Sequence, residues 1–308
     1  MVRTPLSLLV LCGGDSAERA VSLESGRCTA ESLQATGHRV RLLDPADSCT
    51  DADLLQADIV VPMLHGRGGE DGSLQRRLQR LGIPWLGSSP EASELTFSKI
   101  RTRRLLQSLN LPVARGTTLH RGCTEQQIRQ AAAETGFPLV VKPDEQGSSI
   151  GISLIHEEQQ LGPAVQEAFR WSEQCVVEAF VAGREITVAL AGDRLLPLVE
   201  IVPPGNWYDY VAKYQSAATQ YQVAPAGIPA ALPVAAIQAV RAAGASDLTR
   251  TDIRLRPDGS FVILEINTIP GMTTHSLVPL AAAALGLTIG QLLEPLLQQK
   301  LGSDRSAA

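Results

Sequence analysis

Residues 250–273, RTDIRLRPDGSFVILEINTIPGMT, form two strand-like runs that are joined by a Pro-Asp-Gly turn and followed by a glycine-containing loop. Branched aliphatic and aromatic residues fill both runs, as buried strands require. A two-residue hairpin loop at Asp258-Gly259 would pair Asp252 with Glu265, counting back along both strands. A three-residue loop with a bulge would break this register.

The predicted pairing gathers oxygen ligands on one face of the hairpin. Side chains alternate along a strand, so Arg250 and Asn267 fall on the same face as Asp252 and Glu265. Two facing carboxylates repel each other unless a cation lies between them. Oxygen ligands without Cys or His favour Mg²⁺ or Mn²⁺ over zinc. The alternative for this stretch alone is a surface hairpin whose acids are solvated.

The composition is that of a globular protein with more than one domain. A chain of 308 residues exceeds a usual single core, so we expect two or three domains. It is 44% hydrophobic, and no apolar run approaches the roughly 18 residues of a membrane helix. The net charge of −5 argues against nonspecific binding to nucleic acid, and no basic run suggests a membrane surface. Five scattered cysteines without CxxC spacing indicate a reduced, cytoplasmic setting: Cys12, Cys28, Cys49, Cys123 and Cys175.

The first 92 residues are typical of a parallel α/β unit. Three runs read as strands, with a helix after the first, at residues 6–11, 40–43, 59–64 and 20–36. The third strand delivers His65 and the loop HGRGGEDG to its carboxyl end, where open α/β sheets bind ligands. A tight turn, with Glu70 and Asp71 capping a helix at 74–81, is the alternative for this loop. Glu18 either balances a helix N-terminus or holds an ammonium group.

The middle of the chain contains a loop suited to phosphates. Strand-like runs at 137–141 and 150–155 flank a segment of small residues, and a helix begins near Ser98-Lys99. The loop offers unhindered N–H and hydroxyl donors at Gly147, Ser148, Ser149 and Gly151. Each of Lys99 and Lys142 alone is as readily explained as a surface residue. Together, upstream of the acidic hairpin, they favour phosphate neutralisation.

The last third begins with a further strand hairpin. Residues 186–191 and 195–201 are expected to pair, after a strand at 175–179. The Pro- and Tyr-rich segment 203–227, with Lys213-Tyr214 at its centre, has the length of a lid. Helices are expected at 230–244 and 289–300, and the GMTTHSLVP segment between them reads as a loop.

Seven segments together resemble the D-alanine:D-alanine ligases, members of the ATP-grasp superfamily. They are GGDSAER, HGRGGEDGSLQ, VKPDEQGSSIG, EAFVAGREITV, YDYVAKY, RTDI and LEINTIPGMTTHSLVP, in that order. The resemblance covers nearly all of the chain and implies an α/β fold that is α+β in its C-terminal two thirds. Its three domains would be an N-terminal parallel-sheet domain at 1–92 and two ATP-grasp domains at 93–180 and 181–308. ATP would lie between the two ATP-grasp domains.

The resemblance also implies roles for individual residues. For ATP, these are Lys99 and Lys142 on the phosphates, Lys213 reaching the γ-phosphate from the lid, and Glu178, Val181 and Glu185 on adenosine. For D-alanine, these are Glu18 with Ser148 and Tyr214 at the first molecule, and His65, Ser276 and Leu277 at the second. Two magnesium ions would be held by Asp252, Glu265 and Asn267. An oxyanion hole would be formed by Arg250 and the N–H of Gly271.

The implied reaction joins two D-alanines for peptidoglycan precursor synthesis. The first carboxylate attacks the γ-phosphate of ATP, and the second amine attacks the resulting acyl phosphate. Lys213-Tyr214 favours a dipeptide product over D-alanyl-D-lactate or D-alanyl-D-serine. A nucleotide-binding protein without catalysis is the other alternative, which the combined ligands and oxyanion hole disfavour. The resemblance implies a homodimer as well.

Four places depart from the family pattern. They are Ala20, Ser98, Ala179 and the segment Ala245-Ser246-Asp247. None removes an implied ligand. They could alter helix capping, the packing of the adenine site or the support of Arg250.

Overall fold

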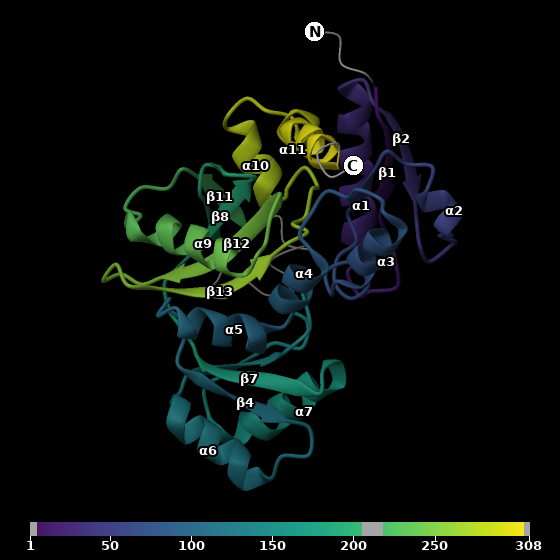
Figure 1. Ribbon diagram of the computed structural model, residues 1–308. Helices are drawn as coiled ribbons and strands as arrows, with labels where there is room; N and C mark the ends of the chain where they lie inside the picture. The colour runs from purple at the N-terminus through teal and green to yellow at the C-terminus, as the bar shows by residue number, and fades with distance from the viewer. Residues whose placement is uncertain (1–4, 205–217, 305–308) are drawn as a thin grey trace.

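Three β-sheets, each covered by helices, follow one another along the chain (Figure 1). The computed structural model describes residues 5–204 and 218–304. Each sheet falls within one of the three ranges expected from the sequence. Within the described ranges, no helix has the length and apolar character needed to cross a membrane.

The first sheet is parallel and has the strand order β2-β1-β3. Its elements are β1 (Ser7–Leu11), α1 (Arg19–Ala35), β2 (Arg39–Leu43), α2 (Asp51–Leu54), β3 (Ile59–Pro62) and α3 (Ser73–Leu81). Strands β1 and β3 are near-continuous apolar runs, as expected for strands flanked by helices, whereas β2 at the edge carries Arg39 and Arg41 and is largely exposed. Their carboxyl ends lie at one edge, so the loops that carry Glu18 and His65 meet there.

The second sheet is antiparallel, with the order β4-β7-β5-β6. Its elements are β4 (Gly116–His120), α6 (Glu125–Thr135), β5 (Leu139–Pro143), β6 (Ser153–Ile155), the 3-10 turn η1 (Glu158–Gln160), α7 (Leu161–Trp171) and β7 (Gln174–Ala179). Helices α6 and α7 pack on one side of this sheet (Figure 1). Helix α5 (Lys99–Ser108) lies on the other side, where it contacts both β7 and β13.

The third sheet is also antiparallel, with the order β11-β10-β8-β12-β13 and β9 paired to β8. Its strands are β8 (Arg184–Ala191), β9 (Arg194–Leu195), β10 (Val199–Val202), β11 (Gln220–Val223), β12 (Leu248–Leu255) and β13 (Phe261–Asn267). Helix α9 (Ala231–Ala242) packs on β8, β12 and β13, and α4 (Pro90–Phe97) contacts β13. The expected hairpin at 186–201 is therefore confirmed as the pairing of β8 with β9 and β10.

The β12–β13 turn differs from the expected two-residue loop. Arg256 and Ser260 are joined by a 2.8 Å hydrogen bond from the Arg256 N–H to the Ser260 carbonyl, which leaves three residues in the loop. Gly259 has a φ of +83°, the left-handed conformation that such a loop needs in its last residue. The predicted turn was therefore wrong by one residue.

A β-bulge in β13 restores the predicted pairing. The register shifts between Asp252 and its neighbour, so that Leu264 is the extra residue on β13. Beyond the bulge, Asp252 faces Glu265 and Arg250 faces Asn267, as the sequence predicted. The longer loop shifts the strand pairing by one residue, and the extra residue Leu264 on β13 shifts it back.

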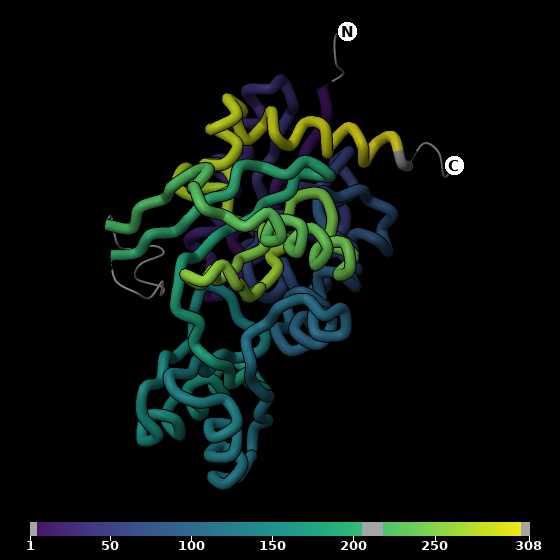
Figure 2. Tube along the Cα trace, turned by 90° about the vertical axis from the view of Figure 1, so that its left-hand side faces the viewer, coloured from purple at the N-terminus to yellow at the C-terminus, as the bar shows by residue number. Residues whose placement is uncertain are grey.

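Of the two C-terminal helices, α11 (Ile289–Asp304) packs against α1 and β8, and α10 (Leu277–Ala283) packs against β8, β10 and β11 of the third sheet. Helices α10 and α11 contribute to one hydrophobic core together with α1, β1 and β3. Figure 2 shows α11 beside the N-terminal segments, far along the chain from them. The sequence predicted α11 but treated the start of α10 as part of a loop, which is wrong from Leu277 onward.

We expect Leu293→Ala to lower the free energy of unfolding by about 2–5 kcal/mol, as buried Leu truncations usually do. Leu293 is fully buried in the core that α11 shares with the first sheet. Leu285→Ala is the matched control, because Leu285 is 40% exposed and should change stability little. Urea unfolding of both variants checks this; equal effects would contradict the shared core.

Candidate active site

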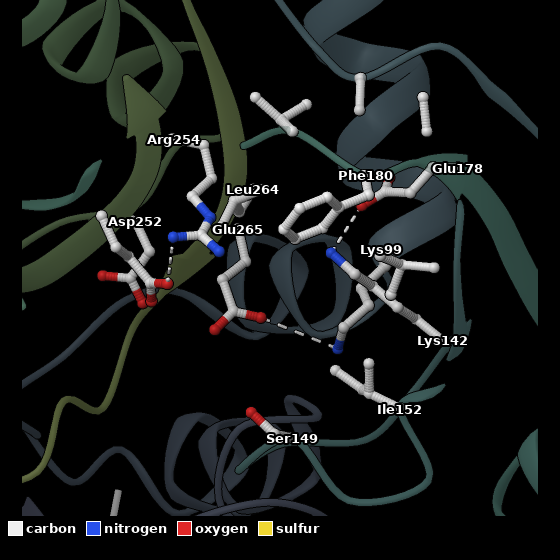
Figure 3. Close-up of a pocket in the computed structure, with 15 residues that line it drawn as sticks. Lys99, Lys142, Ser149, Ile152, Glu178, Phe180, Asp252, Arg254, Leu264 and Glu265 are labelled. Atoms are coloured by element: carbon white, nitrogen blue, oxygen red, sulfur yellow. Dashed lines mark ion pairs between the residues drawn. The ribbon is translucent and has the colours of Figure 1, made fainter. Parts of the chain in front are cut away.

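A cleft of about 680 Å³ of empty volume lies between the second and third sheets. Figure 3 shows Lys99 and Lys142 on one side of it, with Glu178 beside Lys142, and Asp252 and Glu265 on the other side. Its lining residues are Lys99, Ala114, Val140, Lys142, Ser149, Ile152, Glu178, Ala179, Phe180, Val181, Glu185, Asp252, Arg254, Leu264 and Glu265.

Lys99 enters the cleft from the first turn of α5. The Ser98 hydroxyl accepts a hydrogen bond from the Arg101 N–H and donates to Asp144, so the serine at this unusual position still caps the helix. The Lys99 Nζ donates to the carbonyl of Gln146 at 2.5 Å and lies 3.8 Å from a Glu265 oxygen. Lys99 therefore bridges the small-residue loop and the carboxylate pair.

Lys142 and Glu178 form a close ion pair at the base of the cleft. Their Nζ and Oε1 atoms are 2.5 Å apart, and both side chains are nearly buried. Arg103 approaches the other carboxylate oxygen of Glu178 at 3.3 Å. Burial lowers the pKa of the Arg103 guanidinium, and the charge of Glu178 opposes this effect. Sequence reasoning missed Arg103, because its contact with Glu178 depends on how α5 packs on β7.

The acidic hairpin closes the opposite wall of the cleft. Asp252 accepts hydrogen bonds from Arg250, at 2.9–3.1 Å, and from the Thr187 hydroxyl at 2.7 Å. The Arg250 Nη2 atom also lies 4.0 Å from Glu265. The Asn267 side-chain oxygen accepts from the Ile269 N–H at 2.9 Å, which fixes the turn after β13.

These hairpin residues fit a divalent cation by the chemistry of their donors. Two carboxylates and one amide oxygen are hard ligands, and magnesium commonly takes one or two carboxylates together with substrate phosphates. The carboxylates already need positive partners, because Asp252 is buried and faces Glu265 across the strand pair. Among the described residues, no group of three or more His, Cys, Asp or Glu side chains lies close enough together to hold a metal ion.

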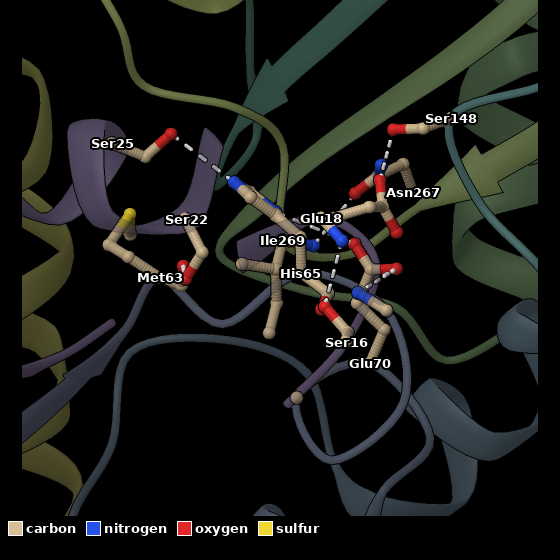
Figure 4. Close-up of polar contacts among 12 residues, drawn as sticks. Ser16, Glu18, Ser22, Ser25, Met63, His65, Glu70, Ser148, Asn267 and Ile269 are labelled. Atoms are coloured by element: carbon tan, nitrogen blue, oxygen red, sulfur yellow. Dashed lines mark hydrogen bonds and ion pairs between the residues drawn. The ribbon is translucent and has the colours of Figure 1, made fainter. Parts of the chain in front are cut away.

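A second polar group lies at the edge of the first sheet (Figure 4). The Ser148 hydroxyl donates to Glu18, which joins the phosphate-type loop to the first sheet. A Cβ atom at Gly147 would lie 2.5 Å from Glu18 Oε2, so a larger residue at this position would displace the Glu18 carboxylate. Ser148 and Ser149 have φ values of 50° and 60°, a local backbone shape that turns successive N–H groups the same way. The Ser148–Glu18 contact therefore brings the first and second sheets together at this point.

His65 is buried in a chain of hydrogen bonds that reaches the loop after β13. Its Nε2 atom lies 3.2 Å from the Ser25 hydroxyl, and that oxygen accepts from the Met272 N–H at 3.1 Å. Glu70 lies 3.9 Å from the other ring nitrogen and accepts from the Gly66 N–H instead of capping α3. Burial raises the pKa of the Glu70 carboxyl, and nearby negative charge adds to this. Sequence reasoning considered Glu70 only as a cap and missed Ser25.

The end of this loop brings the remaining expected residues together. Ser276 precedes α10, and its hydroxyl oxygen accepts from the Thr273 N–H at 3.0 Å. A Cβ atom at Gly271 would lie 2.9 Å from the Ser276 hydroxyl, so Gly271 is in close contact with it. Leu277 is buried at the start of α10. Lys213 and Tyr214 lie outside the described residues.

Arg254 and Phe180 are among the residues that line the cleft without having been predicted. Arg254 is two residues beyond Asp252 on β12, so the alternation that grouped Arg250 with Asp252 also reaches it. Phe180 follows β7 and had no comparable signal.

Lysines and paired carboxylates that face each other between two antiparallel sheets place this chain among the ATP-grasp enzymes. The family model described as D-ala D-ala ligase C-terminus matches residues 105–298. This chain belongs to the D-Ala-D-Ala ligase family.

Solved structures of ligases match this chain over 97–99% of its length. The D-alanine–D-alanine ligase of Bacillus anthracis is 27% identical, with a TM-score of 0.82 over 99% of this chain and 100% of that one. The structure of that enzyme complexed with ATP is matched at 25% identity and TM-score 0.82, over 98% and 100%. The VanG D-Ala:D-Ser ligase of Enterococcus faecalis is 26% identical, with a TM-score of 0.80 over 97% and 99%.

Proposed function

We propose that this protein uses ATP to ligate two D-alanines into D-alanyl-D-alanine for peptidoglycan precursor synthesis. The observation that carries the proposal is the contact between Ser148 and Glu18. It joins a loop suited to phosphates to a carboxylate suited to an amino acid's ammonium group. A simple nucleotide-binding protein would not need the second half of this arrangement.

In the first step, the cleft holds ATP with its phosphates toward the two lysines. Lys142 exchanges its contact with Glu178 for a phosphate, while Arg103 continues to balance the glutamate. Lys99, 3.8 Å from Glu265, neutralises phosphate charge beside the carboxylate pair. The carboxylate of the first D-alanine, oriented by Glu18, attacks the γ-phosphate to give an acyl phosphate and ADP.

In the second step, the amine of the other D-alanine attacks the acyl phosphate. Arg250 and the Gly271 N–H stabilise the oxyanion that forms on the carbonyl. His65, Ser276 and Leu277 bind the second amino acid, and the hydrogen bond between Ser25 and the Met272 N–H fixes the loop that carries Gly271. Phosphate then leaves and the dipeptide is released.

Magnesium or manganese would be held by Asp252, Glu265 and Asn267, and would screen the phosphate charge during transfer. The adenosine would lie against Val181 and Glu185 near Glu178, in the part of the cleft that these residues line. We also propose that the protein is located in the cytoplasm, where ATP and reduced thiols are present, and that it forms a homodimer.

The test is ADP release from magnesium-ATP, with products identified by mass. We expect release with D-alanine but not with L-alanine, and D-alanyl-D-alanine as the product. D-serine and D-lactate are added in separate reactions with D-alanine, because the likeness to VanG makes a mixed product the second candidate. ATP binding without D-alanine-dependent ADP release would overturn the proposal.

A further inference from the structure

Arg254 is a buried cation in the nucleotide end of the cleft. Its side chain is only 8% exposed, and it projects from β12 on the face that carries Asp252 (Figure 3). A buried charge is costly unless partners compensate it. The proposed phosphate and metal contacts do not explain why a cation is buried at this position.

The partners of Arg254 all belong to the segment that follows β7. Its Nη1 atom donates to the carbonyl of Gly183 at 3.1 Å and lies 3.5 Å from Glu185 Oε2. The guanidinium carbon lies 5.8 Å from the centre of the Phe180 ring, within the range of a cation–π contact. One side chain thus contacts both a ring and a carboxylate that line the same cleft.

The backbone register fixes this arrangement. Arg254 and Glu185 are direct partners across the β12–β8 ladder, so their side chains project on the same face. The Gly183 contact limits the guanidinium at one end, and Phe180 limits it at another. Glu185 is itself nearly buried, with 11% of its side chain exposed. Arg254 therefore restricts the orientation of this carboxylate.

We propose that Arg254 is a positioning residue that aims Glu185 at the ribose hydroxyls of the nucleotide and so makes the enzyme discriminate ribose from deoxyribose. The inference rests on the proposed function in taking ATP as the substrate. A carboxylate held in one orientation binds best to a sugar whose hydroxyl donates a hydrogen bond to it. A sugar that lacks the hydroxyl cannot form this hydrogen bond.

The test compares ATP with 2′-deoxy-ATP and 3′-deoxy-ATP in the wild type and in Arg254→Met. In the wild type, at least one deoxy analogue should have a KM about tenfold higher than ATP, the loss expected for one hydrogen bond to a charged group. In Arg254→Met, the KM for ATP should rise by a similar factor while that for the deoxy analogue changes little. The kcat should stay within about threefold, because Arg254 lies outside the reacting groups.

Two control variants distinguish a positioning role of Arg254 from a purely structural role. Arg254→Lys keeps the charge and should restore part of the discrimination. Arg256→Met removes an arginine from the same hairpin whose guanidinium contacts only Ser260 among the hydrogen bonds described, and it should leave discrimination unchanged. Equal rises in KM for all three nucleotides in Arg254→Met, or no discrimination in the wild type, would overturn the proposal.

Calorimetric binding of ADP, 2′-deoxy-ADP and 3′-deoxy-ADP gives a readout that does not depend on ligation. The same loss of discrimination is expected in the dissociation constants. If the protein binds nucleotides with this pattern but makes no dipeptide, the proposed function fails while the role of Arg254 stands. Melting temperatures of the variants establish that each is folded, and a folded Arg254→Met with wild-type discrimination refutes the role.

Discussion

Arg250→Met is expected to lower kcat by a factor on the order of 10²–10³, the usual cost of losing one oxyanion donor. Arg250 is held in place by its hydrogen bonds to Asp252, so its guanidinium is fixed before substrate binds. A preorganised donor acts most strongly on charge that develops in the transition state. The dissociation constant for ATP should therefore change much less than kcat.

Two variants make this result specific. Arg250→Lys keeps the charge but not the forked contact with Asp252, and should recover only part of the activity. Arg184→Met is the matched control, since Arg184 pairs with Glu200 on the same sheet but outside the cleft lining. Stopped-flow measurement of ADP release and dipeptide formation checks both. A kcat for Arg250→Met within tenfold of the wild type would exclude the oxyanion role.

The pairing at the centre of the site could be predicted from local sequence, although one step of the prediction was wrong. Strand alternation and an assumed two-residue turn predicted that Asp252 faces Glu265, and this pairing is observed only because two departures from the assumption cancel. The loop is one residue longer than expected, and the bulge at Leu264 compensates for it. The local sequence does not predict the position of this bulge, because the bulge depends on how the neighbouring strand and helices pack.

Contacts between distant segments were the part that local sequence could not supply. Arg103 meets Glu178 only because α5 packs against β7, and Ser25 meets Met272 only because α1 lies beside the loop after β13. Helix α10 is short and apolar and contains a proline, so its periodicity gave no usable signal. The resemblance to a family supplied roles for single residues, whereas the supporting contacts required the structure.

Removing divalent metal with excess EDTA is expected to abolish ADP formation and to leave the melting temperature nearly unchanged. Phosphate charge would no longer be screened during transfer, a contribution of several kcal/mol and hence at least about 10³ in rate. The stability of the fold, in contrast, should not depend on the metal. Asp252 accepts hydrogen bonds from Arg250 and Thr187, and Glu265 lies 3.8 Å from Lys99, so protein groups balance both carboxylates.

Glu265→Gln tests whether this carboxylate is what the metal requires. The amide keeps the shape of the side chain but removes its charge, so we expect half-maximal activity to need at least about tenfold more magnesium. Glu200→Gln provides the control, because Glu200 is a glutamate of the same sheet that pairs with an arginine outside the cleft lining. Binding of Mn²⁺ in the presence of ATP, followed by electron paramagnetic resonance, reports on the site without turnover. An unchanged magnesium requirement and Mn²⁺ affinity in Glu265→Gln would mean that the facing carboxylates serve only to hold Lys99 and Arg250.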